Sequence, residues 1–513
     1  MPEQSPDNYR HPLTWQGLSR MTAIALAVVS FDASPALAHS LPTHHHRAKT
    51  HHIAPVGDVA ITQTDPTSDE YMSPLPNQAF VRPAVAHASG NNQVVTVNDK
   101  ITYQRFEGIG AAMTDSSAWL IQDELTPANR TQLMSDLFSK SGIHLSFVRI
   151  PMGASDFTRN GVPYSYDDMP PGQTDPTLSH FSIAHDRAYI LPALHEAEAE
   201  NPHITFSMNP WSPPGWMKAN DSLDNADGAG VFLPQYNQQF ANYEVKSVAA
   251  YDRAGVPISD LVPTNEPDVG SLYPGMNFSA QAEGTYISQY LEPTLNAAGL
   301  NSVKVYGNDL SWDQTGYANT VLQMVPHLGG LAWHCYTGDP AVMKLYPNVN
   351  EIMDECSNEL PHFPAALIMA EAFRDNVSIA SVWNVALQPG GGPVQPPDKG
   401  CPGCFGVATV NPETHTYRYT RRYYQLGQLS HFIMRGAVRL DSQASDEPTF
   451  DDTTQAFSPG LVDVAFENPD GTKELVVYNN NASTTTFNVN WNGRVLPNYK
   501  VAPGATTTFS WKK

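Results

Sequence analysis

Residues 261–267 read Leu-Val-Pro-Thr-Asn-Glu-Pro, a short apolar run that ends in an amide and an acid. Seven other short apolar runs resemble it, and stretches with the period of an amphipathic helix separate them. Eight strand–helix alternations over roughly 320 residues predict a (β/α)8 barrel. In chain order, the runs are residues 107–114, 146–152, 204–208, 261–264, 303–306, 331–336, 351–356 and 379–387.

The stretches between the runs predict helices. Residues 126–127 are Thr-Pro, and a capping residue followed by proline is typical of a helix start. Residues 184–200 place apolar side chains three and four positions apart, and residues 233–252 and 279–298 predict further long helices. An open, doubly wound sheet is the alternative architecture. It would need a nucleotide-type glycine turn after the first strand, and residues 108–110 lack the third glycine at the right offset.

From about residue 429 the pattern changes to short strands separated by Asn, Gly and Pro turns, which predicts an antiparallel β domain. Residues 94–97 also predict a strand, and an isolated N-terminal strand needs a sheet to join. We therefore expect residues 79–105 and 429–513 to form one β domain, with the barrel spanning residues 106–428. Four C-terminal strands are predicted, at residues 462–465, 474–478, 485–489 and 506–511.

Residues 1–38 have the features of a signal peptide. Arg10 and Arg20 precede a mostly apolar stretch, and Ala-Leu-Ala at residues 36–38 resembles a cleavage site. The apolar stretch is too short for a stable membrane anchor, so we expect a secreted protein, extracellular or periplasmic, without integral membrane association. Residues 39–78 are polar and rich in Pro and His, which predicts a disordered tether. Its clustered histidines could bind a metal, but no Cys or carboxylate is spaced to complete a site.

The chain of 513 residues has a net charge of −22, although only 16% of its residues are charged. Such an acidic surface repels phosphate backbones and anionic lipids, which argues against nucleic acid as a partner. Neutral sugars are indifferent to this charge. The oligomeric state is left open.

Four cysteines are too few for a disulfide scaffold. Cys401 and Cys404 have the spacing of a redox motif or half a zinc site, but they lie in a stretch rich in Gly and Pro and lack a second ligand pair. We expect them to staple a loop. No metal or organic cofactor is expected.

Catalytic side chains of a (β/α)8 barrel lie at the C-terminal ends of its strands. Glu266 follows the fourth run and Glu355 closes the seventh, so the two acids face each other across the barrel mouth. Two such carboxyl groups are what glycosidic cleavage requires, one as proton donor and one as nucleophile or base. The residues alone leave open which acid takes which role. Polar and aromatic residues at the other ends include Arg149, Asn209, Trp211, Asn308, Asp309, His334, Tyr336, Asp354, Trp383 and Asn384.

From about residue 80 to the end, the chain resembles glycoside hydrolase family 30, the glucosylceramidase-like family. The order and spacing of the matching stretches agree throughout, whereas Asn-Glu-Pro alone would be a weak signal. The resemblance implies a (β/α)8 barrel with a β-sandwich built from both chain ends. The stretches are residues 106–115, 149–152, 155–157, 210–214, 265–267, 333–336 and 383–387 leading into 391–393.

The resemblance implies that Glu266 is the acid/base and Glu355 the nucleophile. Asn265 would bind the sugar 2-hydroxyl, where contacts tighten in the transition state. The expected separation of the two catalytic carboxyl groups is ~5 Å, the spacing of retaining enzymes. The substrate-binding and orienting residues implied by the resemblance are Arg149, Asp156, Trp211, Asn265, Asp309, His334, Tyr336 and Trp383.

Two acids complicate this assignment. Glu371 lies in Met-Ala-Glu-Ala, which resembles a nucleophile motif of the Ser-Glu-Ala type, but its position favours a helix that leads into the eighth strand. Asp354 stands where the family usually has Thr or Ser. Strand alternation predicts that Asp354 points away from Glu355, although an extra carboxylate nearby could still shift the titration of the catalytic pair.

The implied reaction is hydrolysis of β-linked glucosides with retention, by a glucosylceramidase-like enzyme that takes a carbohydrate or glycolipid substrate. An endo-β-1,6-glucanase or a xylan-cleaving enzyme of the same family is the alternative. A non-catalytic carbohydrate-binding protein is an alternative of another class. Loss of either carboxylate would mark it, and both Glu266 and Glu355 are present.

Overall fold

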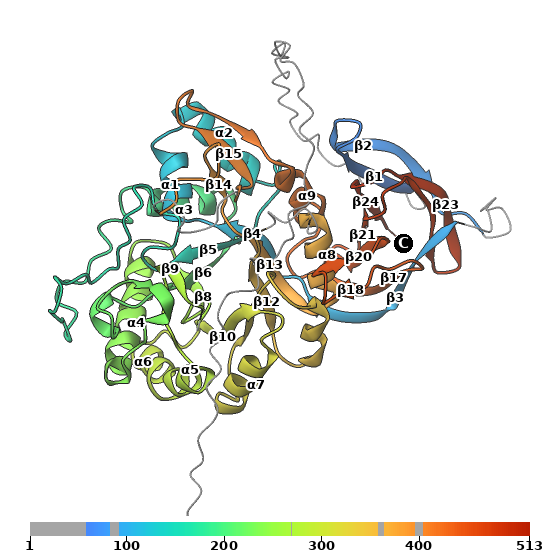
Figure 1. Cartoon of the computed structure of the whole chain (residues 1–513). Helices are drawn as coiled ribbons and strands as arrows, with labels where there is room; N and C mark the ends of the chain where they lie inside the picture. Colours follow the sequence, from blue (N-terminus) through green and yellow to red (C-terminus); the bar gives the residue numbers. More distant parts are fainter. Residues whose placement is uncertain (1–57, 83–91, 268, 358–363, 396–403, 513) are drawn as a thin grey trace, which may run out of the picture. The chain divides into compact units, whose positions relative to one another are not determined.

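The structure is a computed structural model that describes residues 58–82, 92–267, 269–357, 364–395 and 404–512 (Figure 1). The predicted signal peptide, residues 1–38, lies outside these residues. So does Cys401 of the predicted loop staple. Within the described ranges, no helix combines the length and apolarity that a membrane span needs.

Eight parallel strands form a closed barrel, which confirms the predicted (β/α)8 architecture. Their residues are almost all buried, because helices cover the outer face and side chains fill the inside. Phe147, Tyr306 and Ile352 belong to one buried cluster drawn from different strands. The strands are β4 (Gly108–Ala112), β5 (Phe147–Pro151), β6 (Thr205–Asn209), β8 (Ile258–Leu261), β10 (Lys304–Ser311), β11 (Gly330–His334), β12 (Glu351–Glu355) and β13 (Val377–Val382).

The helices begin and end largely where sequence signals place them. Thr126 caps α2, because its side chain accepts a hydrogen bond from the Asn129 N–H, and Pro127 is the first helical residue. The predicted helix over 279–298 is divided by a π-helical turn at Ile287–Leu291, just before Pro293. The α-helices are α1 (Asp115–Gln122), α2 (Pro127–Phe138), α3 (Ile190–Glu200), α4 (Asn237–Arg253), α5 (Ala280–Tyr286), α6 (Glu292–Ala297), α7 (Thr315–Met324), α8 (Ala365–Arg374) and α9 (Arg421–Ser430).

A second sheet, of nine strands, combines both ends of the described chain. β3 lies between strands from the C-terminal part, antiparallel to β17 and parallel to β22. Val95, Leu475 and Phe509 belong to its own hydrophobic core. In sheet order the strands are β2 (Glu70–Ala79), β1 (Asp58–Asp65), β24 (Thr506–Trp511), β21 (Lys473–Asn479), β20 (Leu461–Glu467), β17 (Val438–Ala444), β3 (Gln93–Arg105), β22 (Thr485–Trp491) and β23 (Arg494–Val501).

The predicted tether over residues 39–78 is wrong from residue 58 onward, where β1 and β2 extend the sheet. β1 pairs with β24, and β2 pairs with β1 at the edge. Pro74 and Pro76 suggested an unfolded segment, but an edge strand tolerates proline because one of its sides needs no N–H donors. Residues 39–57 lie outside the described residues.

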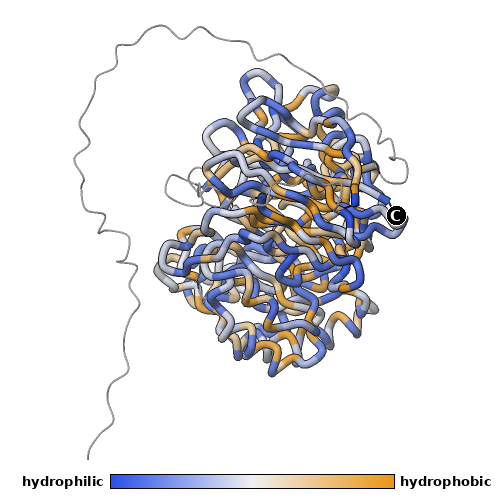
Figure 2. Tube along the Cα trace, turned by 90° about the vertical axis from the view of Figure 1, so that its right-hand side faces the viewer, coloured by the Kyte–Doolittle hydropathy of each residue, from blue (hydrophilic) through white to orange (hydrophobic). Residues whose placement is uncertain are grey.

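Helix α9 joins the barrel to this sheet. The Gln428 side chain hydrogen-bonds Thr64 on β1 and Thr508 on β24, and all three residues are buried. In Figure 2 hydrophobic stretches are concentrated in the middle of the molecule, and hydrophilic ones are frequent along its outer edge. The Gln428 contacts attach the barrel to the second sheet through α9. The mouth of the barrel is built from the C-terminal ends of its strands.

Candidate active site

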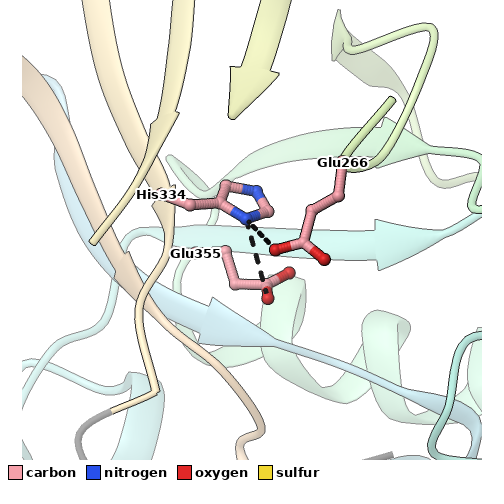
Figure 3. Close-up of side chains that lie close together, drawn as sticks. All are labelled: Glu266, His334 and Glu355. Carbon is pink, nitrogen blue, oxygen red and sulfur yellow. Dashed lines mark hydrogen bonds and ion pairs between the residues drawn. The ribbon is translucent and has the colours of Figure 1, made fainter. Parts of the chain in front are cut away.

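Glu266, His334 and Glu355 converge from the ends of β8, β11 and β12 (Figure 3). His334 Nδ1 lies 3.0 Å from Glu266 Oε1 and 3.9 Å from Glu355 Oε1. One side-chain oxygen of each acid and one imidazole nitrogen all lie within 4.8 Å of one another. The imidazole therefore contacts both acids.

The spacing of Glu266 and Glu355 limits the chemistry. Retaining glycosidases hold their two carboxyl groups about 5–5.5 Å apart, whereas inverting enzymes need about 6.5–9.5 Å for an intervening water. Oxygens of the two groups come within 4.8 Å. The spacing matches direct attack on the sugar by one carboxylate.

Arg149, on β5, is buried at the centre of a cluster of acids. Each of its three nitrogens meets a different acid. Nη1 contacts Glu355, Nη2 lies 3.0 Å from Asp309 Oδ2, and Nε lies 3.0 Å from Asp354 Oδ2. The Trp211 ring covers the guanidinium, with its centroid 4.7 Å from the central carbon. Arg149 thus has its orientation set by contacts on its edges and on one face.

Two asparagines complete the surroundings of Arg149. Nη2 donates to Asn209 Oδ1 over 2.9 Å and to Asn265 Oδ1 over 2.8 Å. Asn209 Nδ2 in turn donates to Asp309 Oδ2 over 3.2 Å. Asn265 precedes Glu266, so this contact also fixes the backbone that carries the predicted acid/base.

Several strand-end residues have a positive φ, which is uncommon for residues other than glycine and tends to occur at functional sites. Glu266 has a φ of 42° and Asp309 of 52°. The Glu266 N–H donates to the Asp309 carbonyl over 3.2 Å, so each conformation supports the other. These turns direct both side chains towards the barrel mouth.

The surroundings of His334 favour its protonated form. Burial alone would lower its pKa, but the carboxylates of Glu355 and Asp309, with hydrogen bonds to Asp309 and Glu266, raise its pKa well above 6.5. His334 therefore acts as a second cation beside Arg149.

Glu355 is held as an acceptor. Burial raises its pKa above the ordinary value, and the charges of His334 and Arg149 oppose that rise. Tyr336 Oη donates to Glu355 Oε1 over 2.6 Å. Positive neighbours and a hydroxyl donor stabilise the carboxylate form that a nucleophile requires.

Two tryptophans lie beside Arg149, and Asp156 lies near the two catalytic acids. The Trp211 and Trp383 rings are stacked with their centroids 5.0 Å apart. Asp156 Oδ1 is buried without a hydrogen-bond partner among the described residues. Burial, followed by the charges of Glu355 and Glu266, raises the pKa of Asp156 well above its ordinary value. A buried acid with an unused oxygen near the catalytic carboxyl groups suits the binding of a sugar hydroxyl.

The structure therefore brings all ten predicted site residues to one barrel mouth, while their catalytic roles stay predictions. Glu371 lies elsewhere, in α8, with Oε2 3.9 Å from Arg374 Nε.

Two residues of the site were not assigned from the sequence. Asn209 was visible as a polar residue at a strand end, but it had no assigned role. Tyr273, on β9 (Ser271–Pro274), donates from its hydroxyl to Glu266 Oε2 over 3.3 Å. No spacing in the sequence marks Tyr273, because the β7–β9 pairing that positions it is a tertiary contact.

The prediction that Asp354 points away from Glu355 is wrong. The pairing of β11 with β12 shifts register there, so that Trp333 faces Met353 while His334 faces Glu355. Asp354 is the extra residue of a β-bulge, and a bulge re-aims a side chain that alternation would turn outward. Asp354 and Glu355 consequently both contact Arg149.

A disulfide that the sequence did not indicate joins Cys335 to Cys356, with Cα atoms 5.1 Å apart. These residues directly follow His334 and Glu355. The cross-link ties together the ends of β11 and β12 at the point where both site residues leave their strands.

Asp309, His334 and Asp354 also lie within 4.8 Å of one another, close enough to share a metal ion. Arg149 already contacts both aspartates and supplies a positive charge between them. Arg149 supplies the positive charge that a metal ion would otherwise bring to these aspartates. We therefore propose no metal at this point.

Comparisons with known proteins identify related sequences and structures. The glycosyl hydrolase family 30 TIM-barrel domain matches residues 106–433, and the family's β-sandwich domain matches residues 436–509. An endo-1,6-β-D-glucanase of Neurospora crassa is 31% identical over 78% of this chain and 84% of that protein. The lysosomal acid glucosylceramidase of Mus musculus is 26% identical over 79% and 80%. The solved structure of the endo-β1,6-glucanase BT3312 superposes with a TM-score of 0.74 and 26% identity, over 89% of this chain and 100% of that one.

Proposed function

We propose, from the premise that the chain belongs to glycosyl hydrolase family 30, that it is an endo-β-1,6-glucanase working by double displacement. Membership rests on the two matched domains. The observation that carries the mechanism is the approach of one oxygen of Glu266 and one of Glu355 to within 4.8 Å, because retaining enzymes hold their two carboxyl groups about 5–5.5 Å apart.

In the first step, the Glu355 carboxylate attacks the anomeric carbon and Glu266 gives its proton to the glycosidic oxygen. The bond between carbon and oxygen breaks, the reducing-end fragment leaves, and a glycosyl ester forms on Glu355. In the second step, Glu266 takes a proton from water, and the water oxygen replaces Glu355 at the same carbon. Two inversions give net retention.

The other groups hold this pair. Arg149 and Tyr336 each contact one oxygen of Glu355 and so fix the orientation of its carboxylate. This orientation lets a lone pair of the carboxylate face the anomeric carbon of the sugar. His334 and Tyr273 hold the two oxygens of Glu266. Asn265 is placed to donate its amide N–H to the sugar 2-hydroxyl, because its oxygen is engaged by Arg149.

The proposed substrate is a β-1,6-glucan. The sequence predicted it as the alternative, and a glucosylceramidase-like activity as the main reading. The Neurospora crassa glucanase shares more of its sequence with this chain than the mouse glucosylceramidase does, at similar coverage. The solved structure of BT3312, at 26% identity, is also described as an endo-β1,6-glucanase. Both observations favour a glucan over a glycolipid.

We also propose that the protein is secreted. The support is the export-type pattern of residues 1–38 together with the Cys335–Cys356 disulfide. Disulfides persist outside the cytosol, where thiols are not kept reduced. Whole-cell fractionation followed by N-terminal sequencing of the secreted chain tests this proposal.

The substrate is tested by incubating the purified protein with pustulan, a linear β-1,6-glucan, and in parallel with laminarin, xylan and glucosylceramide micelles. Glu355→Gln serves as the inactive control. We expect gentio-oligosaccharides of several lengths from pustulan, because an endo enzyme cuts within the chain. Release of glucose from glucosylceramide with pustulan untouched would contradict the proposal, and release of glucose alone from pustulan would contradict endo action.

A further inference from the structure

Two β-bulges lie on either side of β11, and each has an aspartate as its extra residue. In β10, Asn308 faces Ala332 and Leu310 faces Trp333, which leaves Asp309 over. In β12, Asp354 is left over in the same way. Both aspartates have no exposed surface, and both contact Arg149. A pair of bulges therefore brings two carboxyl groups together behind the proposed nucleophile.

An oxygen of Asp354 lies within 4.8 Å of an oxygen of Asp309, and neither Asp354 oxygen accepts a hydrogen bond from a described residue. A buried carboxylate needs hydrogen-bond donors to stay ionised, so the acid of this pair that lacks them favours its protonated form. The two groups have different neighbours. Asp309 meets Arg149 Nη2, Asn209 Nδ2 and His334 Nε2, which all favour the ionised form. Asp354 has only Arg149 Nε at 3.0 Å, and His334 lies 3.9 Å away.

The titration directions agree with this difference. Burial raises the pKa of Asp354 well above its ordinary value, the charges of Arg149 and His334 oppose that rise, and the negative charge of Asp309 adds to it. Burial would also raise the pKa of Asp309, but Arg149 and His334 lower it. Asp354 is therefore the member of the pair that favours the protonated form.

A neutral Asp354 also balances the charges. Arg149 and His334 supply two positive charges, Asp309 and Glu355 supply two negative ones, and Glu266, the proton donor of the proposed first step, is neutral. An ionised Asp354 would add a third negative charge against the same guanidinium. It would draw Arg149 away from Glu355 and would favour protonation of Glu355, which then could not attack.

We propose that Asp354 is a positioning residue that works as a neutral carboxylic acid, donating its proton to Asp309 and holding the Nε edge of Arg149. Arg149 is thereby turned so that Nη1 meets Glu355. The inference rests on the assignment of Glu355 as nucleophile in the proposed function. The protonation state itself does not depend on the substrate.

Asp354→Asn is the decisive variant, because the amide keeps the shape, donates to Asp309 and cannot ionise. We expect its kcat to stay within about threefold of wild type. Asp354→Ala removes both contacts, and a displaced Arg149 should lower kcat about 10²-fold while KM changes little. Asp354→Ser is the second truncation, for use if the alanine variant fails to fold.

Asp260→Asn is the matched control. Asp260 lies on β8 and is buried, and burial raises its pKa to about 7. Its charged neighbours are Lys304, Glu107 and Arg435, none of which belongs to the site. At pH 5.5 it too is a neutral buried acid, so replacing it removes one protonated carboxyl group without touching Arg149.

The proton is observed by infrared difference spectroscopy at pH 5.5, without substrate. The spectrum of wild type minus that of Asp354→Asn should show the carbonyl stretch of a protonated carboxyl group. The spectrum of wild type minus that of Asp260→Asn should show such a band as well. A carboxylate band in its place would overturn the proposal. So would an asparagine variant as impaired as the truncations, or a truncation with undiminished kcat. If pustulan is not hydrolysed but the protonated band is present, the proposed substrate fails and the neutral acid stands.

Discussion

Two buried arginines each hold several acids, and they differ in what else surrounds them. Arg149 at the barrel mouth contacts Asp309, Asp354 and Glu355. Arg374, at the end of α8, contacts Asp463 on β20 as well as Glu447. Arginine among carboxylates is therefore not by itself the mark of a catalytic site.

The Arg149 cluster has three features that the described surroundings of Arg374 do not share. A second cation, His334, bridges two acids. Tryptophan rings lie beside the guanidinium. Residues with positive φ direct the acids to the mouth. The Arg374 cluster instead joins a barrel helix to a strand of the second sheet, so its acids hold two domains together.

The largest expected difference between the clusters is catalytic. Glu355→Gln should lower kcat on the order of 10⁴-fold or more, because it removes the attacking carboxylate. Glu371→Gln should leave kcat within about threefold of wild type, since Glu371 touches only the structural cluster. Initial rates on pustulan with both variants check this. An inactive Glu371→Gln that remains folded would reverse the assignment.

The next effect is on stability. Arg374→Met leaves Asp463 buried without its cation, which should cost about 3–5 kcal/mol of unfolding free energy. Activity per folded molecule should not change. Urea unfolding, with Arg374→Lys as the conservative control, measures the loss. A reduced kcat at unchanged stability would show that this cluster communicates with the mouth.

The smallest effect is a dependence of stability on pH. Burial raises the pKa of Glu371 from 4.5 to about 8, against the charge of Arg374. Between these two values the folded state holds a proton that the unfolded state has lost, so the unfolding free energy falls as the pH rises. The stability that this group confers is fully present below about pH 4.5 and is lost as the pH rises through about 8.

Urea unfolding of wild type and Glu371→Gln at pH 5, 6.5 and 8 tests this dependence. The variant should have a shallower decline, by at most about 1.4 kcal/mol per pH unit. Parallel declines in the two proteins would contradict the raised pKa.

The barrel and most of the mouth could be predicted from the sequence, because both depend on local patterns. Apolar runs give strands, and residues that close the runs lie at one rim. Glu266 and Glu355 were visible in this way. Pairing between distant segments was not visible, which is why β1 and β2 were taken for a tether and the Cys335–Cys356 disulfide was not foreseen.

Bulges set a further limit to prediction. Period-two alternation turns Asp354 outward, and only the register of β12 against β11 shows that it turns inward. Tyr273 is hidden for a related reason, since β7 and β9 must pair before it reaches Glu266. Site residues that lie at the ends of strands could be predicted from the sequence. Site residues whose side-chain direction depends on strand register or on pairing between loops could not.

The most direct test of the difference between the two clusters is covalent trapping. The protein is incubated with a 2-fluoro gentiobioside bearing a dinitrophenyl leaving group, which slows the second step, and the labelled peptide is identified by mass spectrometry. We predict a single glycosyl adduct on Glu355, at the mouth. An adduct on Glu371, or none on an enzyme shown to cleave pustulan, would contradict the account.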